Sequence, residues 1–276
     1  MRTKKMRASP LAVFMLGLFF LFAIIPLFLI VVTAFKSRSD LVKSVFLLPN
    51  PWRFDNIAKA WIQGRFGTYY LNSVLVVIPV VLLSVAFSLS AGYALTIFKT
   101  RISKVALAFF LIGLTLPMEA WIIQAYFHLR SLSLLDSHLG LVLTQVGMSM
   151  PFGVFFMQAS LRGTPSALID ASRMDGASPW TILIRIVAPL SKPANVTLGV
   201  LFFVWTWNEF FLPLVMISSD EKRTLPVGMA FFQGKYSGDI PLTAMGAAMM
   251  ILPIVLLYII LRPYFIGGLT AGAVKE

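Results

Sequence analysis

The chain has 276 residues, of which 58% are hydrophobic and only 12% are charged, and its mean hydropathy is +0.86. A soluble domain carries about 45–50% apolar and roughly 25% charged residues, so the excess indicates surface that faces lipid. The formal charge of +12 comes from Lys and Arg residues spread over short loops, which favours membrane topology signals over a nucleic-acid-binding surface. With no cysteine and two histidines, the chain excludes disulfides, thiol nucleophiles and all-histidine metal sites.

Six apolar runs are each long enough to cross about 30 Å of hydrocarbon, which takes roughly 20 helical residues. The predicted spans are residues 11–35, 71–98, 105–127, 139–161, 194–217 and 240–261. A backbone in lipid must satisfy its own hydrogen bonds, and no alternating ten-residue pattern indicates a barrel. The sequence therefore predicts an all-α membrane protein with six transmembrane helices.

The first span follows a basic cluster of Arg2, Lys4, Lys5 and Arg7, as a signal peptide would. Its apolar run of about 25 residues exceeds the roughly 7–15 of a signal peptide, and no Ala-x-Ala cleavage site follows. We therefore expect a retained first helix, kinked or loosened at Pro26. The cluster beside this helix predicts a cytoplasmic N-terminus, and six spans then place both ends in the cytoplasm.

Two connections are long, residues 36–70 outside and 162–193 inside, and long connections are usually functional. In the inner loop, Thr164 suits an N-cap with Pro165 at the first helical position. Gly176 can adopt the left-handed conformation that ends this helix. The pair Ser178–Pro179 repeats the start signal, and Pro189 is expected to end the second helix. These signals predict a helix, a sharp turn and a second helix. By themselves they are equally consistent with an interfacial helix pair that packs under the bundle and binds no partner.

The loop also resembles the signature loop of permeases from binding-protein-dependent ABC importers. Asp170-Ala171-Ser172 stands where that family has Glu-Ala-Ala, Gly176 follows at the expected spacing, and Ile186 and Pro189 close the motif. The resemblance implies that this loop docks into a groove of a separate ATPase subunit and transmits its closure. The implied coupling residues are Asp170, Ala171, Ser172, Asp175, Gly176, Ala177, Ile186 and Pro189. The shorter acid at Asp170 could alter the contact with the partner.

The resemblance extends over nearly the whole chain and is greatest to the smaller six-helix permease of the maltose-type carbohydrate branch. The matching pieces are Asn56 to Trp61, Leu71-Asn72-Ser73, Gly92-Tyr93-Ala94, Leu134-Leu135-Asp136, Trp207-Asn208-Glu209-Phe210, Leu212-Pro213-Leu214, Thr224-Leu225-Pro226-Val227-Gly228 and Gly268 to Lys275. Glu276 departs from the glycine that the family often has there. The implied fold is the type I ABC importer permease.

We expect residues 1–70 to form the N-terminal segment, first helix and first outer loop. Residues 71–276 then form the core permease, with the coupling loop at 162–193 and a cytoplasmic tail at 262–276 that is either frayed or reaches into the ATPase dimer.

No Gly-x-x-x-x-Gly-Lys-Ser/Thr loop is present to hold ATP, so the energy must come from another chain. We therefore expect no enzyme activity and no cofactor in this chain, with ATP and Mg on the partner ATPase. The resemblance implies two copies of that ATPase, a second non-identical permease and an extracytoplasmic solute-binding protein, in a prokaryotic inner membrane. The implied substrate is a carbohydrate.

Two carboxylates, Glu119 and Glu209, fall inside predicted spans, in the half nearer the outer surface. A carboxylate near the centre of the bilayer costs on the order of 2.5–3.5 kcal/mol. Aromatic faces stack on sugars and amides hydrogen-bond to them. The candidate residues of a translocation pathway are therefore Glu119, Gln124, Trp205, Asn208 and Glu209. Gln145 and Trp207 could also contact a sugar. Each acid could instead snorkel or cap a helix, and each Trp could belong to the interfacial belt.

Three other functions remain as alternatives. The same permease branch serves glycerol-phosphate-type solutes. A homodimeric secondary transporter would require inverted repeats, which we do not detect. A membrane enzyme would require clustered acids, bases or metal ligands, for which two isolated glutamates give thin support.

Overall fold

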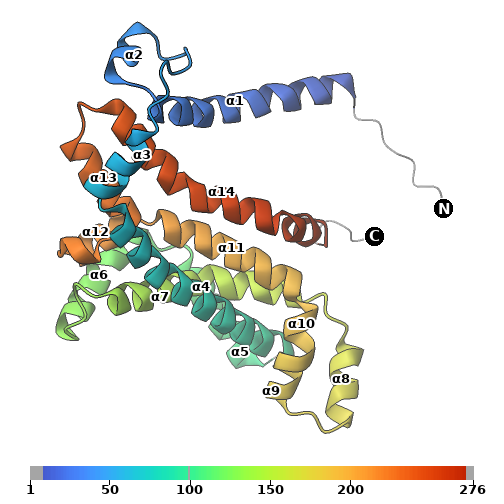
Figure 1. The fold of residues 1–276 in the computed structure, drawn as a ribbon. Coiled ribbons are helices and arrows are strands. Elements are labelled where there is room, and N and C mark those ends of the chain that lie inside the picture. Colours follow the sequence, from blue (N-terminus) through green and yellow to red (C-terminus); the bar gives the residue numbers. More distant parts are fainter. Residues whose placement is uncertain (1–8, 99, 272–276) are drawn as a thin grey trace. The chain divides into compact units, whose positions relative to one another are not determined.

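The structure is a computed structural model that describes residues 9–98 and 100–271, with no side-chain placement for Glu119, Ser166 and residues 262–271. All regular secondary structure in this part of the chain is helical (Figure 1), which confirms the predicted all-α class. The helices are α1 (Pro10–Ala34), α2 (Arg38–Lys43), α3 (Asp55–Gln63), α4 (Phe66–Ile97), α5 (Arg101–Gly113), α6 (Met118–Ser131), α7 (His138–Leu161), α8 (Ser166–Met174), α9 (Pro179–Ile182), α10 (Ala188–Leu190), α11 (Lys192–Asn208), α12 (Phe211–Met216), α13 (Leu225–Lys235) and α14 (Ile240–Ala271). A π-helical segment, Leu183–Val187, joins α9 to α10, and a 3-10 turn, Asp220–Lys222, precedes α13.

Four continuous helices are long and apolar enough to span a membrane: Pro10–Ala34, Phe66–Ile97, His138–Leu161 and Ile240–Leu261. They coincide with four of the six predicted spans. Their large apolar side chains are widely exposed, which suits surfaces that contact lipid. The helix α1 continues through Pro26 without a break in its residue range.

The predicted span 105–127 is not one helix, and this expectation was wrong. The helix α5 ends at Gly113 and α6 begins at Met118 after a break that contains Pro117. Proline disfavours the helical conformation of the residue before it, which explains why the chain breaks there.

The predicted span 194–217 is likewise interrupted. The helix α11 ends at Asn208, Glu209 takes an extended conformation with ψ of 121°, and α12 begins at Phe211. On its other side, α11 follows the segment Pro179–Leu190 across a bend of 80°. Together these two segments form a broken apolar pair.

The described residues fall into two compact units, one within 1–66 and 229–252 and the other within 67–228 and 253–276. In the first unit, the Asn56 amide donates to the carbonyls of Ala34 at 2.8 Å and Lys36 at 3.1 Å, which holds α3 against the end of α1. The Lys36 side chain is only 1% exposed, and its ammonium donates to the carbonyls of Ser44 at 3.0 Å and Val45 at 2.6 Å. Buried charge therefore organises the loop that follows α1.

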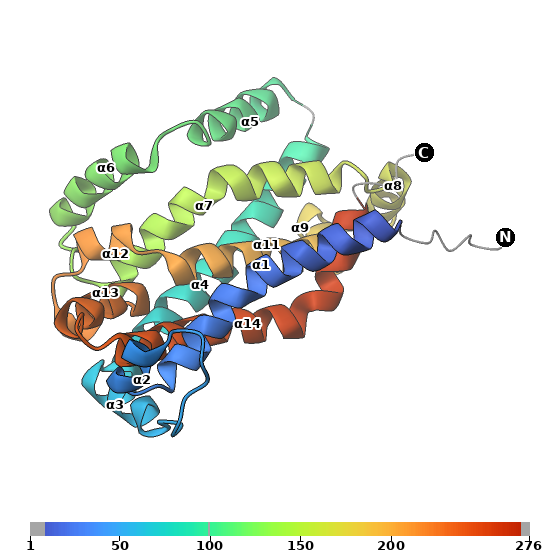
Figure 2. The same cartoon turned by 90° about the horizontal axis from the view of Figure 1, so that it is seen from above.

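In the second unit, α7 contacts α5, α11 and α12, and Figure 2 shows it between α5 and α11. Three apolar clusters follow one another along α7. The first joins α4, α6, α7 and α12 through Val76, Val80, Ile122, Leu129, Leu141, Val142, Val146, Leu212, Met216 and Ile217. The second joins α7 to α11 through Met157, Leu198 and Phe202, with Val81 and Val85 of α4 packed against them. The third lies at the loop 162–193 and is described below.

Glycines permit α4 and α7 to approach closely. A Cβ atom on Gly92 would lie 2.8 Å from the Cβ of Met157. A Cβ on Gly153 would lie 2.0 Å from the Ser88 hydroxyl and 2.9 Å from the Phe202 ring. Small residues at such contacts are the usual means by which membrane helices pack, because no hydrophobic force drives them together in lipid.

A carboxylate joins two loops at the end of α7 remote from the loop 162–193. Asp136 accepts hydrogen bonds from the backbone amides of Ser218 at 3.0 Å and Ser219 at 2.9 Å, from the Ser219 hydroxyl, and from the Lys222 ammonium at 3.0 Å. The Ser219 hydrogen bonds are the main cause that holds the pKa of Asp136 well below its usual range. The carboxylate is therefore ionised at neutral pH and ties the start of α7 to the segment after α12.

Replacing Gly153 with valine should lower the thermal unfolding temperature of the detergent-purified protein by several degrees, because the overpacking costs about 1–3 kcal/mol. The matched control is Gly147→Val in the same helix, where an added Cβ meets nothing within 4 Å. Equal unfolding temperatures for the two variants would contradict the close α4–α7 contact.

Candidate functional site

The first helix of the loop 162–193 starts and stops at short-range signals in the sequence. The helix α8 begins one residue later than predicted, with Pro165 rather than Thr164 in the capping position and no side-chain cap. It ends before Gly176, whose φ of +78° is the predicted left-handed conformation. The predicted second start is confirmed, since the Ser178 hydroxyl accepts a hydrogen bond from the amide of Thr181 at 3.2 Å.

The predicted end of the second helix at Pro189 was wrong. The chain passes from α9 through a π-helical segment in which the amide of Ala188 donates to the carbonyl of Leu183, and it continues to Leu190. Pro189 has no N–H for the carbonyl four residues earlier, and a widened turn accommodates this without ending the helix. The Ser191 hydroxyl then donates to the carbonyl of Val187 at 2.7 Å, where the chain bends into α11.

The loop is anchored on the bundle by the third apolar cluster. Its buried members are Tyr93 of α4, Leu161 of α7, Ile169 of α8, and Ile182, Leu183 and Val187 of the second loop helix. The Tyr93 hydroxyl also donates to the carbonyl of Pro179 at 3.2 Å. Both helices of the loop are therefore packed against the ends of α4 and α7.

The residues implied for coupling divide by exposure. Those exposed are Asp170, Ala171, Asp175, Gly176 and Pro189; Ala177 and Ile186 are half-buried. Ser172 is buried, and its hydroxyl donates to the carbonyl of Leu168 at 2.7 Å, so it is turned away from the exposed face. Asp170 pairs with Arg173 at 3.5 Å on the surface. Such exposed pairs contribute little, so the Asp170 carboxylate is available to a partner at small cost.

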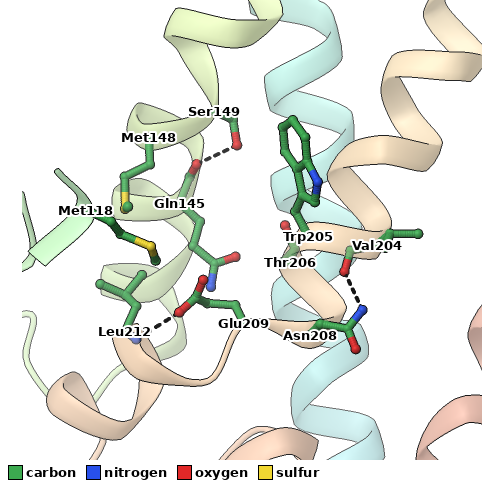
Figure 3. Close-up of a pocket in the computed structure, with 10 residues that line it drawn as sticks. All are labelled: Met118, Gln145, Met148, Ser149, Val204, Trp205, Thr206, Asn208, Glu209 and Leu212. Atoms are coloured by element: carbon green, nitrogen blue, oxygen red, sulfur yellow. Dashed lines mark hydrogen bonds between the residues drawn. The ribbon is translucent and has the colours of Figure 1, made fainter. Parts of the chain in front are cut away.

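A cavity of about 420 Å³ lies between α7 and α11, at the break around Glu209 (Figure 3). This volume falls in the range of small-molecule sites. From α7 it is lined by Gln145, Met148 and Ser149, and from α11 by Val204, Trp205, Thr206 and Asn208. Met118, Glu209 and Leu212 complete the lining.

Gln145 is the most unusual residue of this lining. Its side chain is 6% exposed, and neither its amide nitrogen nor its amide oxygen has a hydrogen-bond partner within the described residues. The neighbouring Ser149 hydroxyl donates to the backbone carbonyl of Gln145 at 2.8 Å, not to its amide. A buried polar group without a partner costs on the order of 1–3 kcal/mol, so this amide calls for a partner from outside the chain.

Glu209 both caps a helix and lines the cavity. Its Oε1 accepts a hydrogen bond from the amide of Leu212 at 3.0 Å, which caps the start of α12. The carboxylate also lines the cavity, and Figure 3 shows it pointing toward the Gln145 amide. The neighbouring Asn208 turns its amide back to the carbonyl of Val204 at 2.8 Å.

The two tryptophans of α11 differ in role. Trp205 is 47% exposed, and its indole lies at the cavity, with its ring centroid 4.9 Å from that of Phe152. Trp207 is buried and stacked on Phe203 at 5.5 Å, so it belongs to the core.

The structure therefore gathers Trp205, Asn208 and Glu209 of the predicted pathway residues. Gln124 is exposed on α6 and is not part of the cavity lining. The backbone of Glu119 lies in α6, and its side chain is outside the described part of the structure. Ser149 and Thr206 were missed. The spacing of four residues between Gln145 and Ser149, which puts both on one face of a helix, was the signal available for Ser149.

The chain matches known proteins over most of its length. Residues 84–264 match the family described as binding-protein-dependent transport system inner membrane component. The chain is 30% identical to a diacetylchitobiose uptake system permease protein of Streptomyces coelicolor, over 91% of this chain and 84% of that protein. It is 31% identical to an arabinooligosaccharides transport system permease protein of Halalkalibacterium halodurans, over 98% and 99%. Its fold is similar, with a TM-score of 0.80 and 25% identity over 92% of this chain and 94% of the other, to that of a bacterial ABC transporter involved in the import of the acidic polysaccharide alginate.

Replacing Ile182 with alanine should loosen the loop from the bundle, because deleting such a buried side chain costs about 2–5 kcal/mol. Ile182 is 1% exposed, whereas Ile184, two residues on, is 51% exposed and provides the matched control. Trypsin should cleave after Arg173 and Arg185 several-fold faster in Ile182→Ala than in Ile184→Ala. Identical cleavage rates would show that the third apolar cluster does not hold the loop.

Proposed function

The chain belongs to the family of binding-protein-dependent transport system inner membrane components, and we propose that it gives a carbohydrate its path across the cytoplasmic membrane by alternating access. The related permeases of Streptomyces and Halalkalibacterium are named for the uptake of sugars, which favours a carbohydrate over a glycerol-phosphate-type solute. The chain is thus a membrane component of a transport system, and it serves as a transport subunit rather than as an enzyme.

One observation carries the proposed mechanism. The loop 162–193 packs on the ends of α4 and α7 through the third apolar cluster, and it continues across an 80° bend into α11. The far end of α11 holds Trp205 and Asn208 of the cavity lining. A displacement imposed on the exposed face of α8 is therefore passed through packed side chains to the cavity.

In the proposed cycle, ATP binding closes an ATPase dimer and moves the docked loop. The surface offered to that partner is the exposed part of α8, where Asp170, Ala171 and Met174 are accessible. The motion opens the cavity outward to a loaded solute-binding protein, and hydrolysis resets the bundle and releases the solute inward.

The partners follow from this mechanism. We infer two copies of an ATPase subunit, which hold the ATP and Mg, because this chain has no phosphate-binding loop. We infer also a second, non-identical permease and an extracytoplasmic solute-binding protein.

The proposed division of the chain places residues 1–70 ahead of a core permease of residues 71–276. Its C-terminal tail, 262–276, would approach the ATPase dimer, and residues 272–276 of that tail lie outside the described part of the chain.

The proposed topology puts both termini in the cytoplasm and the turn after α13 outside. Alkaline phosphatase forms its disulfides, and hence its activity, only outside the cytoplasm. A fusion after residue 237 should therefore be active, and a fusion after residue 276 inactive, in cells that express equal amounts. The opposite pattern would reverse the topology.

The proposed function is tested by purifying the tagged chain from its native membranes and identifying the proteins that accompany it by mass spectrometry. An ATPase and a second permease should be recovered, and the ATPase should be lost from Asp170→Lys, which reverses the exposed charge. Gly176→Val should act in the same direction, because only glycine readily adopts its φ of +78°.

The matched control is Gly163→Val, in the same loop, where the nearest atom to an added Cβ is 3.8 Å away and the backbone is not left-handed. This variant should retain both partners. Recovery of the wild-type chain alone, or only with copies of itself, would instead favour a homodimeric secondary transporter.

A further inference from the structure

The cavity between α7 and α11 has a chemical character that goes beyond a general path for sugars. We propose that Gln145, Glu209 and Trp205 form a solute-binding subsite within this subunit, which takes a neutral, hydroxyl-rich sugar and rejects an anionic one. This inference rests on the proposed function and adds to it the class of sugar and the residues that select it.

Gln145 is the first support for a bound solute. Its amide can donate two hydrogen bonds and accept two, and in the described structure the chain supplies none of them. The side chain extends from α7 toward the Glu209 carboxylate without bonding to it (Figure 3). A hydroxyl placed between them can accept from the amide and donate to the carboxylate. Sugar hydroxyls have this double capacity, whereas an apolar solute would leave the amide unsatisfied.

Glu209 sets the charge that the subsite tolerates. One of its oxygens, Oε1, accepts from the backbone amide of Leu212, and no ion pair to Glu209 is present among the described residues. Among the described residues that line the cavity, none is a Lys, Arg or His. A half-buried carboxylate is poorly screened by salt, so it repels a second negative charge brought to the same cavity. Uronates and sugar phosphates are thereby disfavoured, and neutral hydroxyl groups are accepted.

Trp205 supplies the apolar wall that a sugar ring requires. Its indole is held at the cavity by Phe152 and Phe202, whose ring centroids lie 4.9 and 5.9 Å away. Met118 and Met148 add flexible apolar surface to the lining. A largely apolar cavity with a few convergent polar groups is the usual composition of a small-molecule site.

The fold itself does not impose this choice of charge. A transporter of similar fold is involved in the import of alginate, an acidic polysaccharide. Selection therefore has to come from the side chains that line the cavity rather than from the helix arrangement.

The test uses the complex as it is purified from native membranes, in lipid nanodiscs and without added solute-binding protein. Saturation-transfer difference NMR detects weak direct binding of sugars to the complex. The probes are raffinose and N,N′-diacetylchitobiose, which are neutral, and digalacturonate, which is anionic. We expect saturation transfer to at least one neutral probe and at least tenfold less to digalacturonate. Equal transfer to neutral and anionic probes, or transfer to none of the neutral ones, would overturn the proposal.

Two substitutions assign the effect to residues. Gln145→Leu removes the amide at nearly constant volume and should weaken neutral-sugar binding about tenfold, the effect of one lost hydrogen bond. Its matched control is Gln158→Leu in the same helix, at a side chain that is 8% exposed and outside the cavity, which should bind like the wild type. Glu209→Gln should raise digalacturonate binding toward that of the neutral probes. Unchanged binding in Gln145→Leu, or an unchanged preference in Glu209→Gln, would also overturn the proposal.

The wild-type comparison needs no substitution, so the outcome does not depend on the folding of any variant. The proposed function is judged separately, by whether an ATPase co-purifies and whether its ATP hydrolysis responds to the solute-binding protein. A complex with such an ATPase but no sugar discrimination would refute the subsite alone.

Discussion

The contact between α4 and α7 determines where the other functional parts lie. At Gly92 and Gly153 neither helix has room for a further carbon atom, so the two backbones are locked at one separation. In lipid, such close packing replaces the hydrophobic force that assembles a soluble core. The cavity opens on one part of α7, and the loop 162–193 is seated where α4 and α7 end. If these helices separated, the cavity lining on α7 and the apolar cluster that holds the loop would no longer keep fixed positions relative to each other.

The backbone is irregular at both ends of α11, and at each end a side chain supplies a hydrogen bond to a backbone group. The break after α11 is satisfied by the Glu209 carboxylate, which accepts the amide of Leu212. The bend before α11 is satisfied by the Ser191 hydroxyl, which bonds the carbonyl of Val187. Because a membrane offers no water to unpaired backbone groups, such breaks persist where side chains or a widened turn replace the lost bonds. Gln145 is a contrasting case, a buried polar side chain without a hydrogen-bond partner among the described residues.

The sequence predicts the helical class, four continuous spans and the turn at Gly176, because apolar length and left-handed glycines are local properties. It did not predict the interruptions at Pro117 and Glu209, since apolar composition continues across both. The signal at Pro117 was available, whereas the cap that Glu209 makes depends on a fold not visible in the sequence. The same applies to the site. Trp205, Asn208 and Glu209 were suggested by residue type, but the burial of Ser172 and of Trp207 depends on which side of a helix faces its neighbours.

The bend of 80° between Pro179–Leu190 and Lys192–Asn208 makes these segments the two arms of a crank, with its pivot near Ser191. The longer arm, α11, has 17 residues and so extends about 25 Å. A turn of about 10° at the pivot would carry its far end through about 4 Å, comparable to the width of a sugar ring. In the proposed cycle the ATPase contacts α8, which packs on the segment Pro179–Leu190 through the third apolar cluster, so a small rotation of that segment would reach the cavity. The proposed coupling would then require a stiff bend at Ser191 as well as a contact between α8 and the ATPase.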